Sequence, residues 1–378
     1  MVAVKDQARL SEAASLLLDL MRVFAAQAVL VGHSISWLDI AHFLQPPRAP
    51  YLQQIGVVVF FMLSGFSIAY SVRTKTASPS YTFKAYFVDR FSRVFSAYLP
   101  CLLLVAAIDS AHALFFPGHY SYAYAFDLKT FVGNLFMLQD YPLFPYLSQL
   151  GMVGGGLNIT SFASARPLWT MAIFWWLYMF YGWLHFAADL LSHLRMYLYV
   201  FVLVLLAVVP FYNLEGRGGG LTVVWLFGAG VEFLWSRGRL QRIGPRTLGI
   251  ASVVVFSLAS TYTYLVSRNA YDLTFSGLLS VALLLALGWL AGSTEPRGER
   301  WISHVHSFVK PFAKYSFTLF LLHYSLIEFL LPLTSSWNPW TSLFLFVGVS
   351  NATAALVSLG TGTIQRWGRG RLRSIHCR

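Results

Sequence analysis

Long apolar runs separated by short polar segments make up most of the chain. Crossing the hydrocarbon core of a bilayer as a helix takes about 20 mostly apolar residues. Ten runs qualify, and they lie near residues 16–37, 52–72, 94–116, 168–187, 196–214, 219–235, 248–266, 274–292, 313–332 and 341–361. The pattern therefore predicts an all-α, polytopic integral membrane bundle of about ten transmembrane helices.

The segment 117–167 breaks this pattern, because it is polar and rich in Gly, Pro and Tyr. Its apolar piece from Thr130 to Gln139 is too short to span a bilayer and is expected to form a re-entrant or interfacial element. No internal repeat is visible along the chain, so a transporter built from two similar halves gains no support.

Composition agrees with a lipid environment. Apolar residues make up 57% of the chain and charged residues 11%, whereas a soluble domain carries roughly 25% charged residues. The net charge of +12 would suggest nucleic acid in a soluble protein, but cytoplasmic loops of membrane proteins also gather Lys and Arg. The two cysteines, Cys101 and Cys377, give no disulfide framework and no metal-ligand spacing.

The distribution of basic residues predicts the orientation. With the N-terminus in the cytoplasm, the inside segments hold 21 Lys and Arg residues and the outside segments hold 5, which favours an N-in, C-in topology. The first fifteen residues lack the apolar core of a cleaved signal peptide. We therefore expect a cytoplasmic segment at 1–15, one transmembrane domain at 16–361 and a basic cytoplasmic tail at 362–378.

The first apolar run contains three ionisable residues: Asp19, Arg22 and His33. Charges inside a span are costly and usually mark a functional site. Eleven residues bring a helix about 20° beyond three full turns, so Arg22 and His33 share one face, about 16 Å apart along the axis. Asp19 lies three residues before Arg22 and can pair with it. A neutral His33 facing a cavity can act as a general base toward a hydroxyl.

A structural alternative exists for these residues. Arg22 can extend to the inner interface with Asp19, while His33 bonds a neighbouring helix. The shared face of Arg22 and His33 favours the functional interpretation.

The stretch from Leu18 to His33 resembles the beginning of the acyltransferase-3 family of membrane acyltransferases. Those proteins have an Asp-x-x-Arg, an Arg-x10-His spacing and a His at the outer end of the first span. Similar stretches follow in order at Gly56–Phe66, Phe87–Tyr98, Asn134–Gln139, Leu168–Thr170 with Trp175–Tyr178, and Tyr315–Ser316 with Leu322–Tyr324. The resemblance runs from about residue 15 to residue 361.

The chain departs from the family pattern at three places. Phe174 stands where the family usually has a Glu before paired aromatic residues, so no acid-base role of that Glu carries over. Ser96 replaces a Pro, which affects the local backbone more than the chemistry. Gln365 precedes Arg366 where an acidic residue is common.

The resemblance implies transfer of an acyl group, usually acetyl, from cytoplasmic acyl-CoA to a hydroxyl of an extracytoplasmic or lipid-linked glycan. His33 would act as the base, Asp19 would orient Arg22, and no metal is required. The expected location is the cytoplasmic (inner) membrane, with multiple spans. The expected partners are acyl-CoA, the saccharide acceptor, the bilayer and separate glycan-synthesis proteins, with no nucleic acid.

Basic residues at the predicted inner mouth suit the phosphates of coenzyme A. Arg90 and Arg93 lie three residues apart on one helix face and rank above Arg73 as donor-binding candidates. The alternative for this patch is positive-inside retention with anionic lipid contact.

Trp169 and His323 are candidates for the acceptor side. Aromatic packing for Trp169 and a satisfied core histidine for His323 are the competing interpretations. Ser64 and Gly65 are expected to permit close helix packing rather than to bind a ligand.

Two other functions compete with the enzyme. A transporter or flippase of a sugar lipid would use the buried Arg and His to line a pathway. A family member without activity would serve as an assembly partner, and Phe174 is the residue that favours this alternative. A covalent acyl-enzyme has less support, because neither cysteine is near His33 in sequence and no Ser-His pairing is evident.

Overall fold

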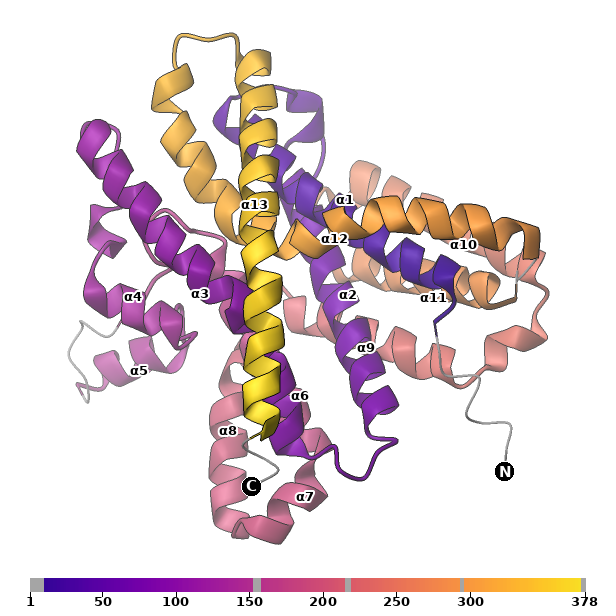
Figure 1. The fold of residues 1–378 in the computed structure, drawn as a ribbon. Coiled ribbons are helices and arrows are strands. Elements are labelled where there is room, and N and C mark those ends of the chain that lie inside the picture. The colour runs from indigo at the N-terminus through magenta and orange to yellow at the C-terminus, as the bar shows by residue number, and fades with distance from the viewer. Residues whose placement is uncertain (1–9, 152–157, 215–218, 293–295, 375–378) are drawn as a thin grey trace. The chain divides into compact units, whose positions relative to one another are not determined.

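The computed structural model describes residues 10–151, 158–214, 219–292 and 296–374 (Figure 1). All regular elements within these ranges are helical, as the apolar pattern predicts. Two compact units are formed, residues 1–77 with 214–316, and residues 78–213 with 317–378.

Most of each of the ten apolar runs lies on one helix. The ten helices are α1 (Glu12–Trp37), α2 (Leu52–Lys75), α3 (Phe83–Phe115), α6 (Leu168–His185), α8 (Met196–Tyr212), α9 (Leu221–Ser236), α10 (Pro245–Tyr262), α11 (Leu273–Gly292), α12 (Pro296–Leu330) and α13 (Pro339–Ser374). The shorter elements are α4 (Leu128–Leu135), α5 (Leu143–Gln149), α7 (Ala187–His193), η1 (His42–Leu44), η2 (Ala123–Ala125), η4 (Arg239–Arg242), η6 (Pro332–Thr334) and the π-helical turn η5 (Thr263–Ser267).

Six helical segments in the described part of the chain are long and apolar enough to cross a membrane. They are Glu12–Trp37, Leu52–Lys75, Phe83–Phe115, Pro245–Ser267, Leu273–Ala291 and Pro339–Gly362. Two further apolar helices, α8 and α9, are shorter. The helical fold is thus confirmed, and six segments have the length and hydropathy of membrane spans, whereas the number of ten and the N-in, C-in topology stay predictions.

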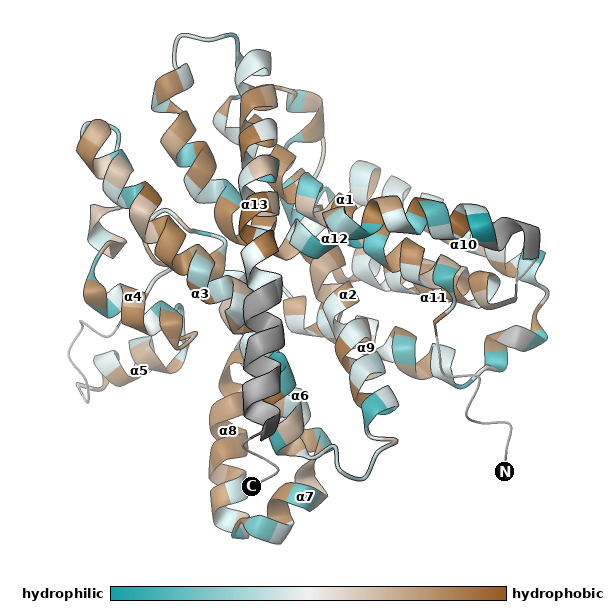
Figure 2. Cartoon of the chain, in the orientation of Figure 1, coloured by the Kyte–Doolittle hydropathy of each residue, from teal (hydrophilic) through white to brown (hydrophobic). Residues whose placement is uncertain are grey.

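Apolar side chains also cover outward faces of the helices. Figure 2 shows hydrophobic residues along most of α8, where Phe201, Val204 and Phe211 are exposed. On α10, Ile250 and Val253 are exposed as well. Apolar faces of this extent suit contact with lipid rather than with water.

The segment between α3 and α6 contains short helices instead of a span. The apolar piece expected at Thr130–Gln139 is split, because α4 ends at Leu135 and Met137 then adopts a positive φ of 56°. Asn134 is fully buried and accepts a bond from the backbone N–H of Phe162 at 3.1 Å. This piece is therefore no spanning helix, as the sequence predicts.

In the first unit, α2 packs between α1 and α9 (Figure 1). A Cβ atom added at Gly65 would lie 1.9 Å from the Trp225 carbonyl oxygen, and one added at Gly228 would lie 1.9 Å from the Met62 carbonyl oxygen. The Trp225 indole N–H donates to Ser64 Oγ at 3.1 Å. These contacts confirm that Ser64 and Gly65 serve close helix packing.

In the second unit, α3 contacts α6 and α13, and α6 contacts α8. Aromatic rings join α3 to α6, with the centroids of Phe95 and Trp175 5.3 Å apart. The Trp183 indole N–H donates to the Tyr199 carbonyl at 3.2 Å between α6 and α8. The dense aromatic segment of α6 is thus a packing surface for its neighbours.

Candidate functional site

Asp19 and Arg22 form an ion pair on α1. Arg22 Nη1 donates to Asp19 Oδ1 at 2.7 Å, one turn earlier on the same helix. Arg22 Nη2 donates to Ser67 Oγ of α2 at 3.0 Å. Two acceptors from two helices therefore fix the direction of the guanidinium, and the predicted pairing of Asp19 with Arg22 is present.

His306 extends this pair on its acidic side. Its Nε2 lies 3.1 Å from Asp19 Oδ2, and its Nδ1 lies 2.5 Å from Glu12 Oε1. The imidazole is only 5% exposed. Burial lowers the pKa of His306, but the hydrogen bonds to Glu12 and Asp19 outweigh that effect, and the net shift is upward.

Sequence reasoning missed His306 and Glu12. They lie 294 residues apart in the chain, and no local motif joins them. The only signal in the sequence is chemical, because a carboxylate at 19 that pairs with Arg22 still has a second oxygen to satisfy.

His33 lies toward the C-terminal end of α1 and is half-buried. The helix is unbroken from Glu12 to Trp37, so the axial separation of about 16 Å from Arg22 holds. The preceding Gly32 touches α2, since a Cβ atom there would lie 2.4 Å from Gln53 Oε1. His33 thus lies beside the start of α2.

A polar network surrounds this end of α1. The Gln53 amide donates to Ser36 Oγ at 3.4 Å, and Ser36 Oγ donates to Gln45 Oε1 at 3.0 Å. Gln45 Nε2 donates to the Ile40 carbonyl at 2.7 Å. These bonds order the chain between α1 and α2, close to His33 in the sequence.

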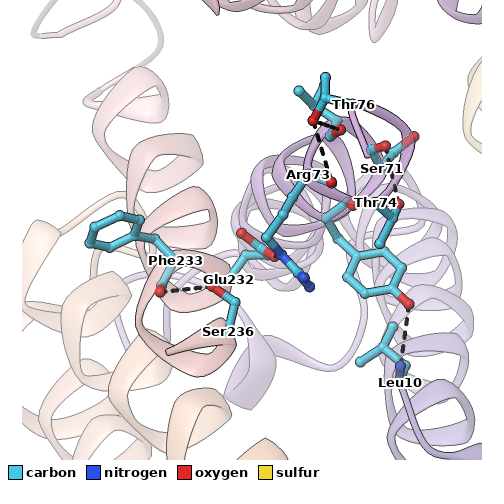
Figure 3. Close-up of polar contacts among 10 residues, drawn as sticks. Leu10, Ser71, Arg73, Thr74, Thr76, Glu232, Phe233 and Ser236 are labelled. Atoms are coloured by element: carbon cyan, nitrogen blue, oxygen red, sulfur yellow. Dashed lines mark hydrogen bonds and ion pairs between the residues drawn. The ribbon is translucent and has the colours of Figure 1, made fainter. Parts of the chain in front are cut away.

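Arg73 pairs with Glu232, a residue that sequence reasoning did not single out. Figure 3 shows the Arg73 guanidinium of α2 directed at the Glu232 carboxylate of α9, and Nε is the atom that donates. Glu232 is 4% exposed, and the Arg73 guanidinium also lies 5.4 Å from the Tyr70 ring centroid. Part of the charge of Arg73 is therefore used to join two helices, which weakens its case as a donor ligand.

The two arginines of α3 differ in exposure. Arg90 is 7% exposed, with its guanidinium 5.7 Å from the Tyr86 ring centroid, whereas Arg93 is exposed. The neighbouring Asp89 is buried and accepts a bond from the Tyr81 hydroxyl at 3.2 Å. Arg90 is therefore held in place by packing, and Arg93 is the more accessible of the two.

The acceptor-side candidates have different surroundings. His323 is fully buried, and its Nδ1 lies 2.9 Å from the Phe320 carbonyl of its own helix. These contacts account for one ring nitrogen of His323, so its acceptor-side role stays a prediction. Trp169 lies half-buried in the first turn of α6, and Phe174 is buried beside Tyr178, with ring centroids 6.2 Å apart.

A buried polar cluster in the second unit was also missed. Asp109 accepts from the backbone N–H of Ser164 at 3.1 Å, and Ser164 Oγ lies 2.7 Å from both Asp109 Oδ2 and Ser325 Oγ. In the same unit, the Tyr122 hydroxyl donates a hydrogen bond to the Glu328 carboxylate. Both acids fall inside predicted apolar runs, so the cost of a charge in a span was a signal that could have found them.

A comparison with models of known protein families identifies the family of this chain. The profile described as an Acyltransferase domain matches residues 16–359, nearly the whole chain. The chain belongs to the acyltransferase-3 family. Searches of curated proteins and of solved structures found no match. Family membership and the apolar helices together make the protein a multi-pass membrane acyltransferase.

Proposed function

We propose that this family member is an O-acyltransferase of the cytoplasmic membrane. It moves an acyl group, acetyl in the first instance, from cytoplasmic acyl-CoA to a hydroxyl of an extracytoplasmic or lipid-linked glycan. The observation that carries the proposal is α1 itself, where the fixed Asp19–Arg22 pair and His33 occupy one continuous helix.

The proposed chemistry uses His33 as the general base. Its imidazole takes the proton of the acceptor hydroxyl as the oxygen attacks the thioester carbonyl. The carbon–sulfur bond then breaks, and the thiolate of coenzyme A receives that proton. The products are the ester and free coenzyme A, so atoms and charge balance. The half-burial of His33 beside a polar network supports this role.

The donor's phosphates are proposed to bind arginine. Arg22 is pre-oriented by Asp19 and Ser67 in the first unit. Arg90 and Arg93 are the donor-binding candidates of the second unit, and Arg73 ranks below them because it pairs with Glu232. Guanidinium groups suit phosphate because they donate several hydrogen bonds in a fixed plane.

Labelled acyl transfer by the purified protein tests this function against its alternatives. Acyl-labelled acyl-CoA is incubated with the protein in liposomes that contain lipid-linked saccharides, and ester-linked label on the saccharide is measured. We expect ester formation together with release of free coenzyme A. Movement of the saccharide lipid without any ester would identify a flippase. A protein that neither forms the ester nor moves the lipid would fit the inactive assembly partner.

A further inference from the structure

Four ionisable residues in the first unit form a continuous chain. Glu12 contacts His306, His306 contacts Asp19, and Asp19 contacts Arg22. Three of them belong to α1, and His306 belongs to the first part of α12. Figure 1 shows this part of α12 lying against α1. The side chains of Asp19 and His306 are 16% and 5% exposed, so water has little access to their contact, whereas the Glu12 side chain is 52% exposed.

Hydrogen-bond chemistry favours one protonation state of His306 when both of its carboxylate partners are ionised. A carboxylate only accepts, and a neutral imidazole has one N–H donor. Both ring nitrogens of His306 lie within hydrogen-bond distance of a carboxylate oxygen, at 2.5 Å and 3.1 Å. Both bonds form together when the ring is an imidazolium. The two carboxylates, the imidazolium and the guanidinium of Arg22 then carry no net charge.

The two oxygens of Asp19 have different partners. Oδ1 accepts from Arg22, and Oδ2 faces His306. A carboxylate is planar, so a bond at one oxygen limits the direction of the other. His306 thereby restricts Asp19, and Asp19 restricts Arg22.

We propose that His306, as an imidazolium held by Glu12 and Asp19, is a positioning residue that orients Arg22 for the acyl donor. This inference rests on the proposed function for the role of Arg22, and on the geometry alone for the state of His306. The protein would then bind its donor best while His306 is protonated.

Two further ionisable residues lie close to His306 on its own helix. Lys310 is exposed one turn further along α12, and His304 is exposed and places its Nδ1 2.6 Å from the Arg300 carbonyl. Neither contacts the carboxylates that hold His306. Within the part of the chain that the structure describes, Glu12 and Asp19 from α1 contact the imidazole, with Arg22 beyond Asp19.

The sign of the pH effect follows from the upward shift of the His306 pKa. An unfolded histidine has a pKa of about 6.5. The imidazolium and its two bonds are therefore complete below about pH 6.5, and they are lost as the pH rises through the higher folded value. We therefore expect acyl-CoA binding to weaken as the pH rises above about 6.5.

Donor kinetics of four variants as a function of pH test the inference. His306→Gln is expected to raise the KM for acyl-CoA about tenfold, because a bond between charged groups is lost, with a smaller effect on kcat. His306→Arg keeps a positive charge and at least two N–H groups, so it should restore acyl-CoA binding and abolish the rise of KM at high pH. Glu12→Gln should move that rise of KM to lower pH. His304→Gln is the matched control, since this exposed histidine lies on the same helix.

A second measurement does not depend on activity. In protein labelled with ¹⁵N at histidine, the His306 resonances should titrate with a midpoint above the value of about 6.5 for a free histidine, and Asp19→Asn should lower that midpoint. A midpoint at or below the free value would overturn the inference whether or not the protein transfers acyl groups. In an active protein, an unchanged donor KM and pH profile for His306→Gln would also overturn it. If the wild type transfers no acyl group, the proposed function fails, and the labelled protein still tests the state of His306.

Discussion

His33→Ala is expected to lower the rate of acyl transfer by about 10²–10⁴-fold, the usual cost of removing a general base. The histidine is half-buried near the end of α1, beside the start of α2. Its side chain is only half-buried, so we expect the loss of packing to be small. The variant should therefore insert and unfold as the wild type does, with the loss concentrated in kcat rather than in the KM for the donor.

His42→Ala is the matched control for this variant. His42 lies in η1 of the same unit, is 65% exposed and contacts Asp39 only at 3.7 Å. Its removal should leave acyl transfer unchanged. If folded His33→Ala retained activity within a few-fold of the wild type, His33 would have no part in the mechanism.

The second large effect is expected at the α3 arginines. Arg90→Ala and Arg93→Ala should each raise the KM for acyl-CoA by about 10- to 100-fold, because one charge-assisted bond to phosphate contributes roughly 1.5–3 kcal/mol. Use of the acceptor should change much less. Calorimetric titration with coenzyme A measures the same loss without turnover.

The burial of Arg90 requires an additional control. Arg90 is 7% exposed, so its removal can also destabilise the helix packing, whereas Arg93 is exposed and gives the cleaner result. Lys84→Ala, an exposed basic residue of the same helix, should leave donor binding unchanged. If both arginine variants bound coenzyme A as tightly as the wild type, Arg90 and Arg93 would not bind the donor. Their positive charge would then reflect membrane topology only.

The helices of this protein could be predicted from sequence because each apolar run is long and continuous. Even the interruption at 130–139 was visible, since the run is too short and lies among Gly, Pro and Tyr residues. The number of membrane crossings is harder to predict. The helix α6 carries Trp and Tyr throughout, and α12 carries many polar residues in its first half, so length and hydropathy do not identify them as spans.

The α1 half of the candidate site was also predictable, because Asp19, Arg22 and His33 lie on one helix and helical geometry fixes their spacing. Its remaining partners come from distant parts of the chain. Ser67 lies 45 residues from Arg22, and His306 lies 287 residues from Asp19. Such contacts depend on how helices pack, and no local pattern encodes them.

The same limit explains why the pairing of Arg73 with Glu232 was not predicted from the sequence. Within its own segment it is one basic residue among several, which suggests a patch for phosphate. Its partner Glu232 lies 159 residues away on α9 and is buried. A buried acid requires a hydrogen-bonding or basic partner, so an unexplained Glu inside an apolar run is a signal that could have pointed to Arg73 as that partner.

Sidedness is the most direct test of the central claim. The protein is placed in liposomes of known orientation, with acyl-CoA confined to the predicted cytoplasmic side and a glycan acceptor confined to the other. Arg22 and His33 lie about 16 Å apart along α1, so a donor bound at the inner end can extend its pantetheine arm toward His33. We expect acylated glycan from donor and acceptor in opposite compartments. Product formed only when both share one compartment would contradict transfer across the membrane.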